Sequence, residues 1–220
     1  MPQTQSQSQT PALSAVLTGD IVRSSRLAPD ALDAVIGALA RGAAAMSDWE
    51  GAEPARFTRF RGDGWQCLAP AQPLALRAAL FLRAHLRALD RDADTRISVG
   101  IGPAAIPPDG NLSAASGAAF EISGRGLDRM ARVQQLAVAW AEPPPGAALV
   151  GAVFALSDEI SRLWTPLQAE VLIEVLSPGD ESQESLAAQH GVSQQAIAKR
   201  LSGGGDWALR RALAALEVEA

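Results

Sequence analysis

A Gly-Asp-Gly triplet between two alternating segments constrains the fold of this chain more than any other feature of its sequence. Residues 56–61 (RFTRFR) and 65–68 (WQCL) alternate apolar with polar side chains, and residues 62–64 lie between them. Glycine and aspartate favour the positive backbone angles that tight hairpin turns need. The pattern therefore predicts a β-hairpin with Asp63 at its tip.

The segments around this hairpin alternate between strand and helix patterns. Further strands are predicted for three short apolar runs, at residues 13–17, 96–102 and 136–141. Helices are predicted where apolar residues recur at helical spacing, at residues 29–46, 73–89 and near 124–132. The order β-α-β-β-α-β with a trailing α-β predicts an α+β fold whose sheet domain is ferredoxin-like or palm-type.

From about residue 157 onward the sequence has helical patterns alone. Thr165, Pro166 and Gln168 combine an N-cap, a proline at the first helical position and the glutamine of a capping box. Three prolines at 143–145 suggest that the sheet domain ends shortly afterwards. The predicted organisation is a disordered tail, a palm-type domain and an all-α domain, over residues 1–11, 12–155 and 156–220.

Residues 182–201 are typical of a helix-turn-helix. A helix over 181–190 is followed by the turn Gly191-Val192-Ser193 and by a helix over 194–201. The segment resembles the helix-turn-helix of bacterial regulators, including sigma-region-4-like and MarR-like modules. Glutamine can contact adenine edges and basic side chains can contact phosphates. The predicted DNA-binding residues are Ser193, Gln194, Gln195, Lys199 and Arg200, although a helix-turn-helix that serves protein packing alone is the alternative.

Charge limits how such a module could bind DNA. The chain carries a net charge of −5, which excludes a generally basic protein that coats nucleic acid. Residues 181–220 hold four basic and five acidic side chains, a net charge of −1. Because phosphate neutralisation dominates non-specific binding, one copy would bind weakly, and a homodimer with two copies would compensate.

Two aspartates form the first candidate site. Asp20 ends the first predicted strand, and Asp63 lies at the tip of the hairpin, which is adjacent to that strand in a βαββαβ sheet. Two converging carboxylates are typical ligands of Mg²⁺ or Mn²⁺ in phosphoryl and nucleotidyl transfer. The simpler alternative is that Asp20 caps a turn and that Asp63 supplies hairpin geometry.

Four blocks of the sequence resemble the SatD family. Residues 18–26 (TGDIVRSSR) resemble its opening, in which an apolar strand runs into Gly-Asp-Ile-x-x-Ser-Arg. Residues 57–66 (FTRFRGDGWQ) resemble its second block, a strand ending in Gly-Asp-x-x-Gln. Residues 96–102 (RISVGIG) and 117–120 (GAAF) are similar to the third and fourth, with alanine in place of proline in the fourth.

The same blocks resemble class III nucleotide cyclases, whose two aspartates bind a metal pair. That resemblance implies metal binding by Asp20 and Asp63. It also implies nucleotide-binding roles for Asp128 and Arg132, which match a ribose-holding Asn and a triphosphate-binding Arg four residues apart on a helix. Arg59 or Arg61 lies where the cyclases have a purine-reading lysine. A carboxylate at Asp128 in place of a neutral amide favours nucleotide binding over turnover.

These features predict a nucleotide- and metal-binding regulatory protein with a DNA-binding helix-turn-helix, active in transcriptional or stress regulation. The alternatives are an active nucleotidyl cyclase or nucleotidyltransferase, whose helical domain is a tether or dimerisation module, and a structural adaptor. Cys67 is the single cysteine, which excludes a disulfide framework and suits a reducing compartment. A cytoplasmic location is expected because there is no signal-peptide pattern and no apolar run of about 20 residues.

Overall fold

The computed structural model describes residues 13–49, 54–179 and 181–217, so the predicted tail lies outside the described residues. Its strands form one five-stranded sheet in the order β2-β3-β1-β4-β5. Neighbouring strands are antiparallel except for β4 and β5, which are parallel. The strands are β1 (Leu13–Ile21), β2 (Arg56–Phe60), β3 (Gly64–Leu68), β4 (Thr95–Pro103) and β5 (Leu136–Trp140).

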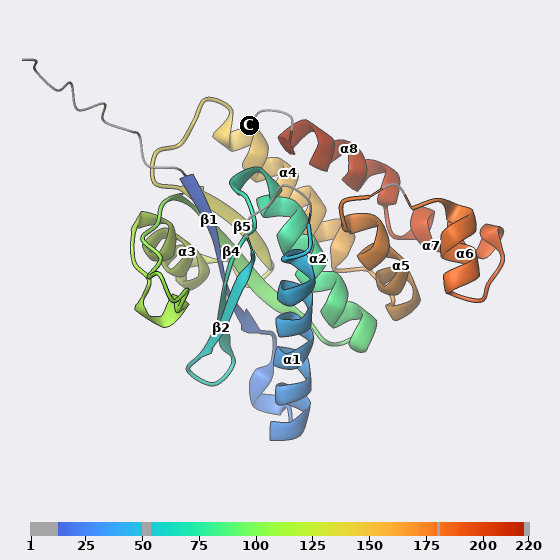
Figure 1. The fold of residues 1–220 in the computed structure, drawn as a ribbon, viewed down its shortest axis with the longest axis horizontal. Coiled ribbons are helices and arrows are strands. Elements are labelled where there is room, and N and C mark those ends of the chain that lie inside the picture. Colours follow the sequence, from blue (N-terminus) through green and yellow to red (C-terminus); the bar gives the residue numbers. More distant parts are fainter. Residues whose placement is uncertain (1–12, 50–53, 180, 218–220) are drawn as a thin grey trace, which may run out of the picture.

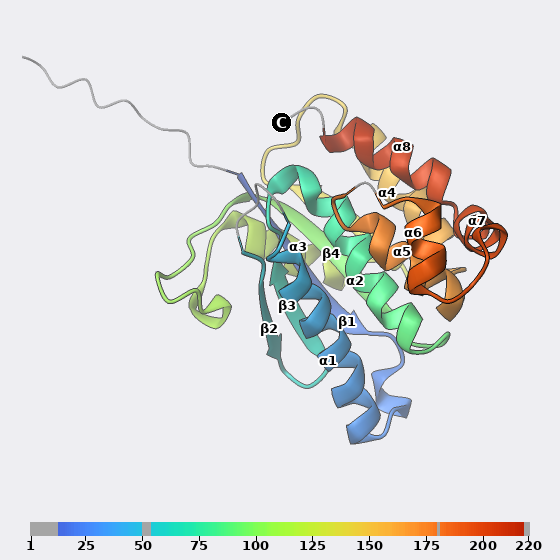
Figure 2. The same ribbon diagram turned by 45° about the vertical axis from the view of Figure 1, so that its right-hand side comes forward.

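Helices cover both faces of this sheet and extend well beyond it. Helices α1 and α2 pack on one face and α3 packs on the other, while α5 packs against the outer side of α2 (Figures 1 and 2). None of the described helices is long and apolar enough to cross a membrane. The helices are α1 (Pro29–Met46), α2 (Ala75–Leu89), α3 (Ala118–Arg129), α4 (Ala147–Ser161), α5 (Pro166–Leu176), α6 (Gln183–Gln189), α7 (Gln194–Gly203) and α8 (Asp206–Glu217).

The predicted order of strands and helices around the hairpin is confirmed, and the fold is a mixed α/β arrangement. The hairpin turn brings Arg61 and Gly62 to positive φ angles of 46° and 77°. The capping box of Thr165 and Gln168 opens α5 as predicted. The third helix differs from the prediction, because α3 begins at Ala118 and ends at Arg129 rather than covering 124–132.

The predicted domain boundary at residues 155 and 156 falls inside the continuous helix α4. One hydrophobic core includes residues of the sheet, of α2 and of all four C-terminal helices. An ion pair between Arg77 of α2 and Glu217 of α8, with Nε and Oε1 2.7 Å apart, adds a polar connection. The sheet and the C-terminal helices therefore share one interior.

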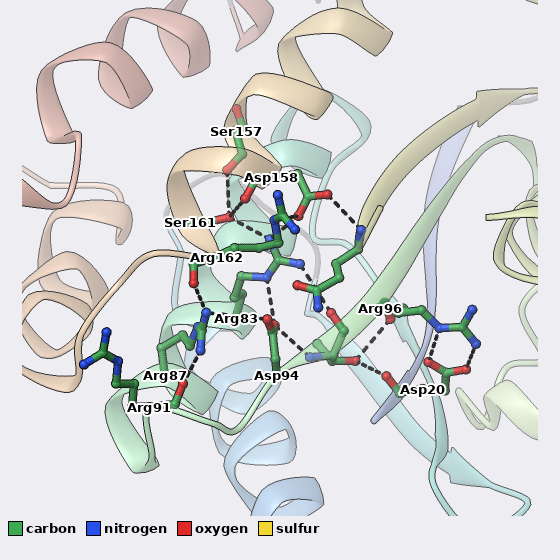
Figure 3. Close-up of polar contacts among 12 residues, drawn as sticks. Asp20, Arg83, Arg87, Arg91, Asp94, Arg96, Ser157, Asp158, Ser161 and Arg162 are labelled. Carbon is green, nitrogen blue, oxygen red and sulfur yellow. Dashed lines mark hydrogen bonds and ion pairs between the residues drawn. The ribbon is translucent and has the colours of Figure 1, made fainter. Parts of the chain in front are cut away.

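A buried ion network joins α2, α4 and the segment before β4 (Figure 3). Arg83 is 1% exposed, and its Nη1 donates to Asp158 Oδ1 at 2.9 Å and to Ser161 Oγ at 2.7 Å. Its Nε lies 3.2 Å from Asp94 Oδ1. The second oxygen of Asp158 accepts a hydrogen bond from the backbone N–H of Gln135 at 2.8 Å. A charge buried this deeply requires such partners, because an unpaired one would be very costly.

Two further guanidinium groups border the network. Arg87 donates to the backbone carbonyls of Arg91 and Arg162, and burial lowers the pKa of Arg87. Arg162 pairs with Glu159, which raises the pKa of Arg162. The guanidinium groups of Arg83, Arg87 and Arg162 thus surround two buried carboxylates, those of Asp94 and Asp158. Removal of the negative charge of either carboxylate would leave more buried positive charge without a partner.

We expect Asp158→Asn to lower the free energy of unfolding by about 3–5 kcal/mol, because it preserves side-chain size while leaving buried Arg83 with too little negative charge. Urea unfolding followed by circular dichroism measures this change. The matched control is Glu121→Gln. It removes an exposed ion pair in which Glu121 Oε2 lies 3.7 Å from Arg125 Nη1, and it should change the free energy of unfolding by less than about 0.5 kcal/mol. Equal effects of the two substitutions would contradict the stabilising role of the network.

Candidate functional site

The first candidate site lies where β1 ends, β3 begins and β4 begins. In the antiparallel register, Asp20 of β1 lies opposite Gly64 of β3 on one side and Arg96 of β4 on the other. Because β1 is central in the sheet, its last residues meet the hairpin tip and the start of β4 at the same edge. The predicted adjacency of the strand that carries Asp20 and the hairpin that carries Asp63 is confirmed.

Asp20 is bound by a guanidinium group from the neighbouring strand. Arg96 Nε donates to Asp20 Oδ1 at 2.8 Å, and Arg96 Nη2 donates to Asp20 Oδ2, so both carboxylate oxygens accept hydrogen bonds (Figure 3). These hydrogen bonds are the main reason why the pKa of Arg96 is raised. Burial has a smaller effect and lowers the pKa of Arg96. The negative charges of Asp20, Asp63 and Asp128 raise that pKa further.

Asp63 belongs to the β2–β3 turn and accepts a hydrogen bond from the hydroxyl of Ser24. Ser24 begins a short 3₁₀ helix, Ser24–Arg26, directly after β1. Arg23 and Arg61, one on each of these two turns, have positive φ angles of 58° and 46°. A non-glycine residue in this region costs about 1–3 kcal/mol, and such positions gather at functional sites. Two strained arginines beside two aspartates therefore make this edge a candidate binding site.

Helix α3 approaches the same edge because it packs unusually close to β4. A Cβ at Gly100 would lie 2.2 Å from the carbonyl oxygen of Ala119, so only glycine permits this contact. Thr18 and Ser123 are both buried and share a hydrogen bond of 2.7 Å. Gly126 lies against Ser98, whereas Ala119 lies against Gly100, so the helix runs antiparallel to β4 and its last turn, which carries Asp128, lies toward the start of β4.

The predicted pairing of Asp128 and Arg132 on one helix is wrong. Helix α3 ends at Arg129, and Met130 is its C-cap residue with an extended backbone. Arg132 is exposed in the turn that follows, outside the last helical turn. The four-residue spacing thus does not place the two side chains on one helix face, because the helix stops between them.

The predicted nucleotide-binding arginines of the hairpin have different surroundings. Arg59 Nη1 lies 2.7 Å from Asp33 Oδ1 of α1, and its Nε donates to the carbonyl of Gly62. Arg59 is thus directed toward α1 rather than toward Asp20. Arg61 is exposed at the turn itself. Of the two, Arg61 is the one whose position on the turn leaves it next to Asp63.

The residues at this edge do not fit a metal ion as they are arranged. Both oxygens of Asp20 are bound to Arg96, and one oxygen of Asp63 is bound to Ser24. Within residues 13–49, 54–179 and 181–217, no three His, Cys, Asp or Glu side chains are grouped as a metal site requires. Magnesium usually binds one or two carboxylates together with water and phosphate oxygens. A cation at Asp20 would therefore have to replace the guanidinium of Arg96.

The second candidate site is the pair of short helices α6 and α7. Ser193 is the N-cap of α7, and its Oγ accepts a hydrogen bond from the backbone N–H of Ala196 at 3.2 Å. Gly191, in the turn before it, has a φ of 62°, which glycine adopts without strain. Ile197 and Leu201 are buried on the inner side of α7. The local sequence thus forms the helix, turn and helix that its capping residues predict.

The outer side of α7 carries the polar residues that the sequence singles out. Gln194, Gln195 and Lys199 are exposed, and Arg200 is half-buried. Ser193 is exposed, but its hydroxyl oxygen is used in the helix cap. Gln194, Gln195 and Lys199 therefore offer free polar groups within the first two turns of a helix that stands at the surface.

Arg96 and Ser24 are the site residues to which sequence reasoning assigned no role. The signal for Arg96 was present, because antiparallel pairing of the strands at 13–17 and 96–102 brings opposite charges at their ends together. Ser24 could not be found in this way, since its contact with Asp63 joins two loops 39 residues apart.

No protein-family model matches this chain, and no curated protein matches it.

We expect Arg96→Gln to lower the stability of the fold by about 1 kcal/mol, because it removes the counter-charge of a partly exposed carboxylate. Addition of Mg²⁺ should then raise the melting temperature of this variant more than that of the parent, since the carboxylates lack their internal cation. Differential scanning calorimetry with and without Mg²⁺ measures both effects. Arg125→Gln on α3 is the control, and a Mg²⁺ effect equal in all three proteins would contradict the competition at Asp20.

Proposed function

We propose that this chain is a regulatory protein that binds a nucleotide at the β1–β3–β4 edge and DNA through α6 and α7. The observation that carries the proposal is that Asp20 with Arg96 and Asp63 with Ser24 form polar contacts at one edge of the sheet, where the end of β1, the β2–β3 turn and the start of β4 meet. The strand order β2-β3-β1-β4 agrees with the palm-type sheet that the resemblance to the SatD family and to class III cyclases implies.

The nucleotide would be held by side chains of both charges. Arginine binds phosphate with two parallel hydrogen bonds, and Arg23 and Arg61 project from the two turns that flank the acidic residues. A ribose hydroxyl can donate to a carboxylate such as Asp128. A phosphate that brings its own Mg²⁺ or Mn²⁺ supplies both the cation for Asp20 and an anion for Arg96. Exchange of these partners would open the Asp20–Arg96 pair without leaving either charge uncompensated.

Asp128 favours sensing over cyclisation in this proposal. Its negative charge opposes the negative charge that develops on reacting phosphates, and it cannot donate a hydrogen bond to the ribose. The active cyclase or nucleotidyltransferase stays the alternative. It would be supported by robust formation of a cyclic nucleotide that Asp128→Asn abolishes.

The DNA contact would be made by the outer side of α7. The exposed glutamines and Lys199 lie in its first two turns, and the first turns of a recognition helix contact base edges in the major groove. Glutamine can form two hydrogen bonds with adenine, and lysine can bind phosphate or guanine. A helix pair that served only packing would bury this side against another part of the chain, whereas these side chains are exposed.

We expect Asp63→Asn and Asp20→Asn each to weaken Mg²⁺-dependent nucleotide binding by at least about tenfold, because each removes a carboxylate that a nucleotide-bound cation would contact. Isothermal titration with ATP, GTP, CTP and UTP in the presence of Mg²⁺ measures the affinities. Asp48→Asn is the matched control, because Asp48 is exposed just past the opposite end of α1. Parent-like binding by both site variants would show that the carboxylates are not part of a nucleotide site.

For DNA, we expect Lys199→Ala to weaken binding to all sequences alike and to reduce the salt dependence by about one phosphate contact. Gln195→Ala should instead relax the preference at one base pair, by about 1–3 kcal/mol. Selection from random duplexes at low salt, followed by fluorescence anisotropy, measures both. Arg210→Ala on α8 is the charge control, since Arg210 pairs with Asp206 outside α7. Failure of the parent to retain any duplex would favour the packing-only alternative.

A further inference from the structure

The first ten residues of helix α4, residues 147–156, are apolar around the whole circumference of the helix. Among its fifteen residues, AALVGAVFALSDEIS, Asp158 and Glu159 are the charged ones, and Asp158 is buried in the ion network. Its inner side, with Phe154 and Ser157, faces the interior, whereas Leu149 and Leu156 on its outer side are 74% and 66% exposed. A helix with two apolar sides is normally covered on both. The outer side of α4 therefore lacks a cover within the described chain.

The exposed leucines of this helix follow a heptad spacing. Leu149 and Leu156 are seven residues apart, and Leu163, seven residues further in the turn after α4, is 78% exposed. Residues seven apart lie two turns apart on nearly the same side of a helix. Ala152 is exposed between the first two leucines. These four residues, Leu149, Ala152, Leu156 and Leu163, form a surface that we call the α4 stripe.

We propose that the α4 stripe binds the α4 stripe of a second copy of this chain, with the two helices antiparallel about a two-fold axis at Leu156. A two-fold interface requires a surface that is complementary to itself. The stripe meets this requirement in its sequence spacing, because Leu149 and Leu163 are each seven residues from Leu156, and the C-cap residue Arg162, which precedes Leu163, keeps a helical backbone conformation. Leu156 then contacts its own equivalent, Leu149 contacts Leu163 of the partner subunit, and small Ala152 lets the helices approach closely.

Charge and size agree with a second copy as the occupant. Glu159, the one exposed charge of α4, is seven residues from Ala152 and therefore lies on the same side of the helix as the stripe, where it is paired with Arg162. In the antiparallel arrangement the two Glu159 residues are displaced by six positions, or about 9 Å along the axis, so they do not oppose each other. The carbonyl of Val133, whose side chain is 76% exposed, accepts a hydrogen bond from Arg162 at 3.3 Å.

The exposed area lies at the lower end of what a dimer needs. Together the three leucines expose roughly as much surface as two whole leucine residues per protomer. Doubled, and with the exposed alanines of α4, this approaches a total of about 1,000 Å², which is the lower limit for a specific interface between two proteins. Single exposed leucines are common on monomers, whereas an aligned row of this size marks an interaction surface.

This inference deepens the proposed function, because a dimer supplies the second copy of α7 that a module with a net charge of −1 needs for DNA binding. The α4 interface itself depends on neither nucleotide nor DNA. Its tests therefore measure association of the full chain in the absence of both ligands, and their failure is distinguishable from failure of the proposed function.

The first test is analytical ultracentrifugation of the full chain. We expect a dimer for the parent and a dissociation constant raised by about 100-fold or more for Leu156→Glu, because the substitution places two negative charges at the two-fold axis. Leu89→Glu is the matched control, since Leu89 is 47% exposed on α2, and it should leave the dimer unchanged. Circular dichroism establishes that both variants fold. A parent that is monomeric at every concentration, or a Leu156→Glu variant that dimerises like the parent, would overturn the proposal.

The second test fixes the orientation by cysteine cross-linking with diamide as the oxidant. Leu156→Cys should form a disulfide between two copies, because its equivalent lies across the axis. Leu149→Cys alone should not, whereas a chain with both Leu149→Cys and Leu163→Cys should. Native Cys67 is fully buried, and burial raises its pKa to about 12, so it does not compete. Cross-linking of Leu149→Cys as efficiently as of Leu156→Cys would overturn the antiparallel arrangement.

Discussion

Arg83 is a fully buried positive charge whose partners come from parts of the chain far apart in sequence. Its guanidinium contacts the carboxylates of Asp94, before β4, and of Asp158, on α4. Because an unpaired charge in this interior would be very costly, the packing of α2 fixes α4 against the sheet. Helix α5 follows α4 after a short turn and packs on the outer side of α2, so the C-terminal helices take their position from the same interaction.

The same network continues to the candidate nucleotide site through Thr95. The carbonyl of Thr95 lies 3.4 Å from Arg83 Nη2, and its hydroxyl donates to the carbonyl of Asp20 at 2.7 Å. Trp65 Nε1 of β3 donates to that hydroxyl oxygen at 2.9 Å. The neighbours of Thr95 in the sequence are Asp94, which contacts Arg83, and Arg96, which binds Asp20 (both labelled in Figure 3). The geometry of the acidic edge therefore depends on the interior that holds α4.

Local patterns predicted much of this structure, and contacts between distant residues account for the rest. The hairpin and α1 follow from turn chemistry and apolar periodicity near each residue. Helix α4 was missed because a helix apolar on all sides has no periodicity to detect. Asp20 was identified from its place after a strand, but Arg96 depends on strand pairing, and the Arg83–Asp158 pair joins residues 75 apart. The sequence alone predicted that Asp20 and Asp63 lie close together, but it did not predict that the guanidinium group of Arg96 binds Asp20.

The packing of α5 on α2 has a consequence for how the chain is synthesised. Nearly every side chain of α2 is buried in the finished fold, partly by a helix that ends at Leu176. About 90 residues separate the ends of these two helices, which a ribosome adds in roughly 5 to 20 seconds. During this interval the outer side of α2 and the charge of Arg83 lack their partners. The nascent chain thus emerges with the outer side of its central helix exposed to solvent until α5 has been synthesised.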